Sequence, residues 1–314
     1  MDNFHPPELD ENKDISDSTD SNDVKLSDTK EKTSDSAEEQ TNDLVEDAPS
    51  QLNIMKIPVT PFESYNQVLK CVEERIESNQ KSFCIAVNPL KIYHAWQQPE
   101  LLKILQKADL CICDGIGVSI ASRILHGISI KRCTGCDLFF QLVSLASHKG
   151  WSVYMLGASS ESNSAACEKI KQMFPSLKIV GNQDGYFKDS SEVIEKINAS
   201  NADLLFVAMG SPKQEQWIWE HWKSISVNFC MGVGGSFDIA AGNLKRAPKI
   251  FRMTGTEFLY RLLSEPRKRW KIQKPLFPFF MRVLGKKLVD IVLVSDDVRK
   301  PKEVVNINGK KVDR

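Results

Sequence analysis

One carboxylate, Asp114, stands where an apolar run of strand length turns through glycine into a helical pattern. The run Leu110 to Cys113 precedes it, and Gly115 and Gly117 follow it. A residue at such a turn lies at the C-terminal edge of a sheet, where open α/β folds bind their ligands. A carboxylate held there has the chemistry of a general base; capping of the following helix is the alternative interpretation. We take Asp114 as the candidate catalytic residue.

The chain after residue 50 alternates strand-like and helical segments, which must position Asp114. Nearly continuous apolar strands alternating with helices predict an α/β fold: a Rossmann-like, mostly parallel sheet with helices on both faces. Residues 55–62 are expected to be a short lead-in and 181–187 a polar turn. Strands are expected at 83–87, 110–113, 151–156, 177–180, 203–208 and 227–231, and helices at 64–78, 91–107, 137–148, 161–174, 190–200 and 213–222.

Right-handed crossovers bring the strand-to-helix loops to one edge of such a sheet. Four of the five expected loops contain glycine, which lets backbone N–H groups approach a ligand, and helix N-termini behind them favour phosphate. Neither G-x-G-x-x-G nor G-x-x-x-x-G-K-[ST] occurs, so a dehydrogenase, a methyltransferase and a P-loop protein are all disfavoured. The candidate substrate-binding residues in these loops are Asn88, Gly157, Gly210, Lys213, Gln214, Gly234, Gly235 and Asp238.

The overall charge of zero hides a division along the chain. Residues 1–50 hold 16 Asp/Glu against 4 Lys, whereas residues 51–314 hold 37 Lys/Arg against 25 Asp/Glu. The acidic segment nearly lacks aromatic residues and has no signal-peptide pattern, so we expect it to be disordered. The expected organisation is an acidic tail at 1–52, an α/β core at 53–244, a basic helical appendage at 245–287 and a C-terminal tail at 288–314.

The expected appendage combines positive charge with large apolar residues. It holds 13 Lys/Arg against 2 Asp/Glu, interleaved with seven Phe, Tyr and Trp residues. This mixture suits an anionic membrane surface or nucleic acid. We expect membrane contact and no nucleic acid, with a basic helix packed on the domain as the alternative. No run reaches the roughly 18 consecutive apolar residues of a membrane-spanning helix.

Eight cysteines could hold a metal or form disulfides. Most lie in apolar strand-like or helical surroundings, and without a secretory signal we expect reduced, buried thiols. A zinc site from Cys111, Cys113, Cys133 and Cys136 is disfavoured, because the first pair lies inside a strand rather than in a zinc knuckle. We expect no metal and no cofactor.

The loop motifs together resemble one family. In order along residues 83–270, CDGIGVSIASRI, KRCTGCDLF, YMLGASSE, AMGSPKQEQWI, GVGGSFDIAAGNLKRAPKIFR and FLYRLLSEPRKRW resemble the WecG/TagA/CpsF family of bacterial glycosyltransferases. The resemblance implies transfer of a hexose, N-acetylhexosamine or its uronate from a UDP-sugar, such as UDP-N-acetylmannosamine, to a sugar on a polyprenyl diphosphate. It also implies a cytoplasmic enzyme, peripheral on the inner face of the membrane, in teichoic acid, capsule or exopolysaccharide synthesis. A homo-oligomer is left open.

The resemblance also assigns residues. It implies Asp114 as the catalytic base and Gln214 and Arg132 as further site residues. One position departs from the family: Ala86 stands where members often have Thr, which affects a substrate contact and the identity of the sugar. The basic appendage, thought to close over the donor diphosphate and to touch the membrane, matches Arg261, Arg267, Lys268, Arg269 and Lys271.

No D-x-D motif, which many nucleotide-sugar transferases use to hold a divalent metal, occurs in residues 51–314. We therefore expect metal-independent transfer. Asp114 would deprotonate the acceptor hydroxyl, and Arg132 with the basic appendage would stabilise the departing diphosphate. A single base without a second carboxylate as nucleophile favours inversion. The alternative function is a non-catalytic, membrane-associated nucleotide-binding or regulatory protein on the same fold.

Overall fold

The computed structural model describes residues 50–299. All of these residues belong to one compact unit. The expected acidic tail up to residue 49 and the expected C-terminal tail from residue 300 lie outside the described part.

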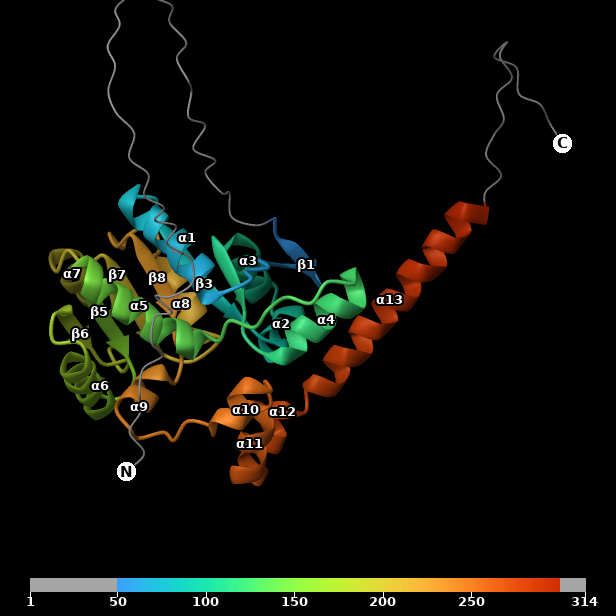
Figure 1. The fold of residues 1–314 in the computed structure, drawn as a ribbon. Coiled ribbons are helices and arrows are strands. Elements are labelled where there is room, and N and C mark those ends of the chain that lie inside the picture. Colours follow the sequence, from blue (N-terminus) through green and yellow to red (C-terminus); the bar gives the residue numbers. More distant parts are fainter. Residues whose placement is uncertain (1–49, 300–314) are drawn as a thin grey trace, which may run out of the picture. The chain divides into compact units, whose positions relative to one another are not determined.

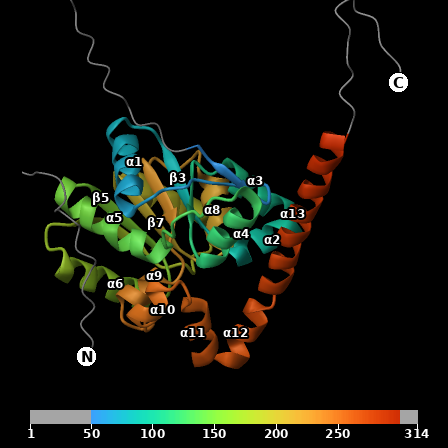
Figure 2. The same ribbon diagram turned by 45° about the vertical axis from the view of Figure 1, so that its right-hand side comes forward.

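A six-stranded parallel sheet forms the centre of the described part (Figure 1). Its strands lie in the order β4-β3-β8-β7-β5-β6, and helices cover both faces (Figure 2), which confirms the predicted α/β class. Every residue of β3, β4, β7 and β8 is buried, as expected for strands covered on both faces. The bounds are β3 (Ser82–Val87), β4 (Leu110–Cys113), β5 (Ser152–Gly157), β6 (Lys178–Gln183), β7 (Leu204–Ala208) and β8 (Phe229–Gly232).

The helices of the core begin at local capping signals. Side chains of Ser64, Asn88, Thr134, Ser159 and Asp189 accept hydrogen bonds from the first turns of α1, α2, α5, α6 and α7, which satisfies backbone N–H groups that have no partner within the helix. The bounds are α1 (Tyr65–Glu77), α2 (Pro89–Gln97), α3 (Pro99–Lys107), α4 (Ile116–His126), α5 (Gly135–Lys149), α6 (Ser160–Met173), α7 (Ser190–Ala199), α8 (Lys213–His221) and α9 (Ser236–Ala240).

Three local predictions are corrected. The single helix expected at 91–107 is two helices, because Pro99 disfavours helical backbone at Gln98, whose φ is −126° and ψ 95°. The polar turn expected at 181–187 begins inside β6. This edge strand alternates between exposed and half-buried residues, so its sequence is less apolar than that of the central strands. The expected lead-in at 55–62 holds the turn and second strand of a hairpin, β1 (Leu52–Ile54) and β2 (Ile57–Val59), whose turn lacks the usual Asn-Gly signal.

Four helices follow the core: α10 (Lys249–Met253), α11 (Glu257–Ser264), α12 (Pro266–Gln273) and α13 (Leu276–Arg299). Neither α10 nor α11 buries a residue fully, whereas α13 inserts Phe279 and Val283 into the hydrophobic core. The boundary expected at residue 287 falls within α13, a continuous helix. None of the helices in residues 50–299 is both long and apolar enough to cross a membrane.

Candidate active site

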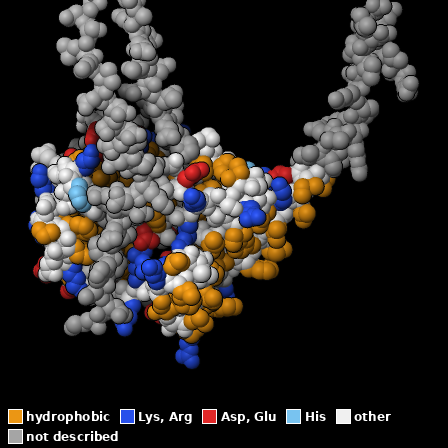
Figure 3. Space-filling view, viewed as in Figure 1, with side chains coloured by type: hydrophobic (Ala, Val, Ile, Leu, Met, Phe, Trp, Pro, Cys, Tyr) orange, Lys and Arg blue, Asp and Glu red, His pale blue; other side chains and the backbone are white. Residues whose placement is uncertain are grey.

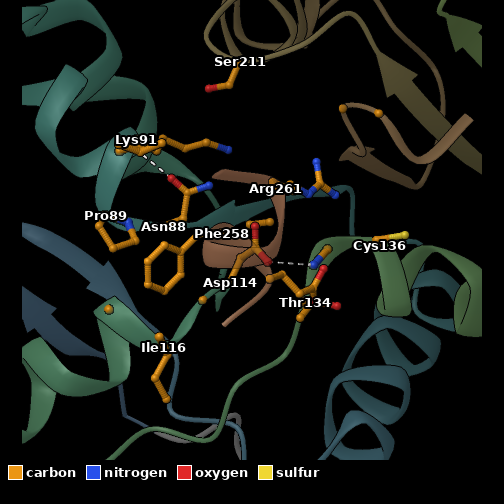
Figure 4. A pocket seen from close by; sticks show the side chains of 18 of the residues that line it. Asn88, Pro89, Lys91, Asp114, Ile116, Thr134, Cys136, Ser211, Phe258 and Arg261 are labelled. Carbon is orange, nitrogen blue, oxygen red and sulfur yellow. Dashed lines mark hydrogen bonds between the residues drawn. The ribbon is translucent and has the colours of Figure 1, made fainter. Parts of the chain in front are cut away.

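A cavity of about 570 Å³ opens at the C-terminal ends of β3, β4 and β8, a size typical of small-ligand sites. Strand ends and the loops that follow them form one side. Residues of α11 and α12 and the start of α13 form the opposite side. Figure 4 shows Phe258 and Arg261 of α11 together with Asp114 and Asn88 of the sheet edge. The cavity therefore lies between the sheet edge and the C-terminal helices.

Sheet register places Asn88 beside Asp114. Val87 and Cys113 are paired residues of β3 and β4, and the Asp114 N–H donates to the Val87 carbonyl at 2.8 Å. The next residue on each strand therefore emerges at the same level. Asn88 uses its Oδ1 to accept from the Lys91 N–H at 2.9 Å, which orients its amide toward Asp114 (Figure 4).

Asp114 is a half-buried carboxylate open to the cavity. Burial raises its pKa above the ordinary value, because a charged group loses hydration there. Several groups offset part of this effect by favouring the charged form: the Lys91 ammonium, the Gly135 N–H at 3.4 Å from Oδ1, the Asn88 side chain and the Arg132 guanidinium. A carboxylate whose pKa is raised yet still compensated is suited to accepting a proton.

A buried ion pair lies behind Asp114. Lys91 Nζ is 2.7 Å from Glu215 Oε1, and the two side chains are only 5% and 2% exposed. Burial alone would raise the pKa of Glu215, but the charge of Lys91 and hydrogen bonds from Lys91, Ser211 and Gln214 together outweigh it, so the net shift is downward. Glu215 is therefore held as the charged partner of Lys91.

Gln214 connects the loops that follow β7 and β8. Its Oε1 accepts from the Gly210 and Gly234 N–H groups, each at 3.1 Å, and its Nε2 donates to Glu215 Oε1 at 3.0 Å. Gly232 is required beside it, since a Cβ on this residue would lie 2.4 Å from Gln214 Nε2. The amide thus fixes the positions of two glycine turns at the edge of the cavity.

The opposite side of the cavity carries cations and an aromatic ring. Arg261 and Phe258 come from α11 and Arg269 from α12. Arg132 joins the two sides: its guanidinium donates to the Arg252 carbonyl and lies 3.9 Å from Glu257 Oε1. Positive side chains therefore face the carboxylate Asp114 across the cavity.

Seven of the predicted site residues line this cavity: Asn88, Asp114, Arg132, Gln214, Gly234, Gly235 and Arg261. Arg269, named with the basic appendage, lines it as well. The structure places Gly157, Gly210, Lys213, Asp238, Arg267 and Lys271 outside the lining, and the side chain of Lys268 outside the described part.

Strand order explains the most distant of these. Gly157 ends β5, which β7 separates from β8, and strands lie about 4.8 Å apart. Lys213 Nζ points to the Gly185 carbonyl at 3.4 Å, toward the β6 end of the sheet. Gly210 acts through its N–H on Gln214 rather than through the cavity surface. Their predicted roles in substrate binding stay predictions.

Lys91, Glu215 and Phe258 were not predicted from the sequence. Lys91 follows an N-cap and lies in the first turn of a helix, where a lysine side chain is usually exposed to solvent. Glu215 lies in the first turn of α8, where a glutamate side chain is also usually exposed. The only available clue was that both residues lie in the first turns of helices that start at the site edge of the sheet.

A metal site is not apparent in the described part of the chain: within residues 50–299, no three His, Cys, Asp or Glu side chains are grouped to hold an ion. All eight cysteines are free thiols, and five are buried. Burial raises the pKa of Cys113, next to Asp114, to about 12, so its thiol stays neutral. The cysteines nearest the site therefore act as packing residues.

Comparison with known proteins identifies the family. The model of the glycosyl transferase WecG/TagA/CpsF family matches residues 52–291. Three relatives carry the name N-acetylglucosaminyldiphosphoundecaprenol N-acetyl-beta-D-mannosaminyltransferase. One from Bacillus spizizenii is 36% identical over 71% of this chain and 84% of its own length. One from Bacillus subtilis is 33% identical over 63% and 77%, and one from Staphylococcus aureus is 30% identical over 67% and 82%.

The matched region contains the whole sheet, every cavity-lining residue and most of α13. The chain is a glycosyltransferase and belongs to the WecG/TagA/CpsF family.

Proposed function

We propose that this glycosyltransferase moves N-acetylmannosamine, or a close relative of it, from UDP to N-acetylglucosamine on a polyprenyl diphosphate. The names of the three relatives support the sugar and the acceptor. The observation that carries the proposed chemistry is Asp114, a half-buried carboxylate that shares a cavity with Arg261 and Arg269. A base on one side of the cavity and cations on the other suit a reaction that removes a proton from one substrate and releases a diphosphate from the other.

Asp114 is the proposed general base. The proton of the acceptor hydroxyl passes to its carboxylate while the hydroxyl oxygen forms a bond to the anomeric carbon of the donor. The bond from that carbon to the UDP oxygen breaks, and UDP leaves with the electron pair. The cavity lining offers Asp114 and Glu257 as carboxylates, and Glu257 lies close to Arg132, so direct displacement with inversion is the proposed course.

Positive charge stabilises the leaving UDP in this scheme. Arg261 and Arg269 line the cavity, and their planar guanidinium groups suit bidentate contact with phosphate. Arg132 is partly occupied by its contacts with Arg252 and Glu257, so its proposed role is to hold the C-terminal helices over the donor. The absence of a D-x-D motif supports charge stabilisation by these side chains without a divalent metal.

The outer face of α13 is the proposed membrane contact. Phe277, Met281, Leu284 and Leu288 are 74%, 52%, 45% and 64% exposed, and Figure 3 shows hydrophobic side chains gathered over the C-terminal helices. Apolar residues beside Arg and Lys suit the interface of an anionic bilayer. Such contact would bring the cavity to a lipid-linked acceptor.

Asp114→Asn tests the central assignment. With UDP-N-acetylmannosamine and a lipid-diphosphate-linked N-acetylglucosamine, we expect transfer to fall by roughly 100- to 10,000-fold, with unchanged UDP binding. Asp184→Asn is the matched control, because Asp184 follows β6 at the far end of the same sheet edge and does not line the cavity. Full transfer by Asp114→Asn would remove Asp114 as the base.

Two further arms of the same assay test the rest of the proposal. Loss of transfer on addition of EDTA would contradict a metal-independent reaction. A wild-type protein that binds UDP but transfers no sugar from a panel of UDP-sugars would favour the non-catalytic alternative. Analysis of the anomeric configuration of the product tests inversion.

A further inference from the structure

The Lys91–Glu215 pair is not explained by the fold. The two side chains are almost fully buried and 2.7 Å apart, and Lys91 lines the cavity. Removing two charges from water is costly, and a well-packed apolar pair of similar volume is often as stabilising. A buried pair at this position therefore points to a function that an apolar pair would not supply.

The ammonium of Lys91 acts on two carboxylates. It contacts Glu215 directly, and it is the strongest of the groups that favour the charged form of Asp114. Glu215 Oε1 accepts from Lys91 and Gln214, and the Ser211 side chain also favours the charged form of Glu215. The pair thus contacts Gln214 directly, and Lys91 lines the same cavity as Asp114 and acts on it through its charge.

We propose that Lys91 and Glu215 are positioning residues for sugar transfer: Glu215 fixes the Lys91 ammonium, which compensates the negative charge of the catalytic carboxylate. The inference rests on the proposed role of Asp114 as the base. Without the ammonium, burial would leave Asp114 protonated over a wider pH range and unable to accept a proton. Without Glu215, the ammonium would pair with Asp114 itself and block its oxygen.

The charged and titratable groups on the same side of the cavity as Asp114 come from three parts of the chain. Lys91 belongs to α2, Cys113 to β4, and Arg132 and Cys133 to the connection before α5. Asn88 and the Gly135 N–H add uncharged hydrogen bonds. Both thiols have raised pKa values and stay neutral near neutrality. Across the cavity, Arg261, Arg269 and Glu257 face Asp114 from α11 and α12. Lys91 and Arg132 are therefore the cations on its own side of the cavity that can tune the carboxylate.

The test measures kcat/KM against pH with the UDP-sugar and lipid-linked acceptor. At acid pH the base becomes protonated and kcat/KM falls; this fall is the acid limb of the profile. A higher pKa of Asp114 therefore moves the acid limb to higher pH. We expect Lys91→Met to move it upward by about one pH unit, whereas Lys91→Arg, which keeps the charge, leaves it in place. Glu215→Gln should lower kcat and move the limb downward.

A double variant separates charge compensation from a structural effect. Lys91→Met alone leaves the Glu215 carboxylate buried and unpaired, which can unfold the protein. Lys91→Met/Glu215→Leu removes both charges, restores folding as measured by thermal unfolding, and keeps the upward shift of the acid limb. A double variant with the wild-type acid limb would overturn the proposal, as would an upward shift in Glu215→Gln.

The inference and the proposed function fail in distinguishable ways. If Asp114→Asn keeps full transfer, the assignment of the base is wrong and the inference falls with it. If Asp114→Asn is inactive but Lys91→Met keeps the wild-type acid limb, the base stands and the positioning role alone is wrong.

Discussion

The two sides of the cavity are built in different ways. The wall, formed by Asn88, Lys91, Asp114, Gln214 and Gly232, comes from strand ends and first helical turns whose backbone positions the sheet determines. The roof, residues 249–273, consists of the three short helices α10 to α12, and neither α10 nor α11 buries a residue fully. The proposed base thus belongs to the side whose positions the sheet determines, and the candidate diphosphate cations belong to the loosely packed side.

A few contacts hold the roof over the wall. Arg132 bridges to the Arg252 carbonyl and to Glu257, and Gly255 packs so closely on Ile116 that a Cβ would lie 2.9 Å from it. The strongest anchor follows the roof: α13 buries Phe279, which stacks on Trp96 with ring centroids 5.8 Å apart. A preorganised wall with a sparsely held roof suits a site that must admit and release large substrates.

Removing the anchor should have the largest effect. Phe279→Ala deletes a fully buried ring from the core, and we expect it to lower the free energy of unfolding by about 3–5 kcal/mol. Phe277→Ala is the matched control, because Phe277 is 74% exposed and surface changes stay within about 0.5 kcal/mol. Denaturant unfolding of both variants measures the difference; equal losses would mean that α13 is not anchored through Phe279.

Removing the roof cations should affect turnover without affecting stability. Arg261→Ala/Arg269→Ala deletes the two roof arginines that line the cavity, and we expect transfer to fall by about 100-fold or more with an unchanged unfolding midpoint. Arg267→Ala/Lys271→Ala removes the same charge from exposed positions outside the lining. Initial rates at one salt concentration compare the two variants, and an equal loss in both would show that net charge matters rather than placement.

The wall was more predictable from the sequence than the roof. Alternating strands and helices predict the sheet, and residues that directly follow strands, such as Asn88 and Asp114, must then lie at its edge. The pattern does not contain the strand order, so Gly157 was grouped with residues that β7 separates from it. Phe258 could not be placed, because no local signal shows where an exposed helix folds back.

Buried polar groups were the other gap. Lys91 and Glu215 look like solvent-facing residues in their own helices, and only tertiary packing brings Nζ to Oε1. The helix break at Gln98, by contrast, follows from Pro99 and could have been predicted. Local backbone conformation can therefore be predicted from the sequence, whereas ion pairs between helices that lie far apart in the sequence cannot.

A smaller change to the wall tests its rigidity. Gly232→Ala places a Cβ 2.4 Å from Gln214 Nε2, so the amide must shift and weaken its bonds to the Gly210 and Gly234 N–H groups. We expect kcat/KM to fall about tenfold and stability by about 1–2 kcal/mol. Gly285→Ala in α13 is the control, since no atom lies within 4 Å of its Cβ and alanine favours helix. Unchanged kinetics in Gly232→Ala would contradict the role of Gln214 in fixing the glycine turns.

The smallest expected effect concerns stability and has the opposite sign. Burial raises the pKa of Asp114 in the folded protein, so its ionised form destabilises the fold at neutral pH, and protonation relieves this as the pH falls through the folded pKa. Asp114→Asn carries no charge and should therefore be slightly more stable than the wild type at neutral pH. The difference should vanish below the ordinary Asp pKa of about 3.9, where both proteins are uncharged at this position. Unfolding midpoints against pH measure it, and a less stable Asp114→Asn at neutral pH would mean that the wall stabilises the carboxylate more than burial destabilises it.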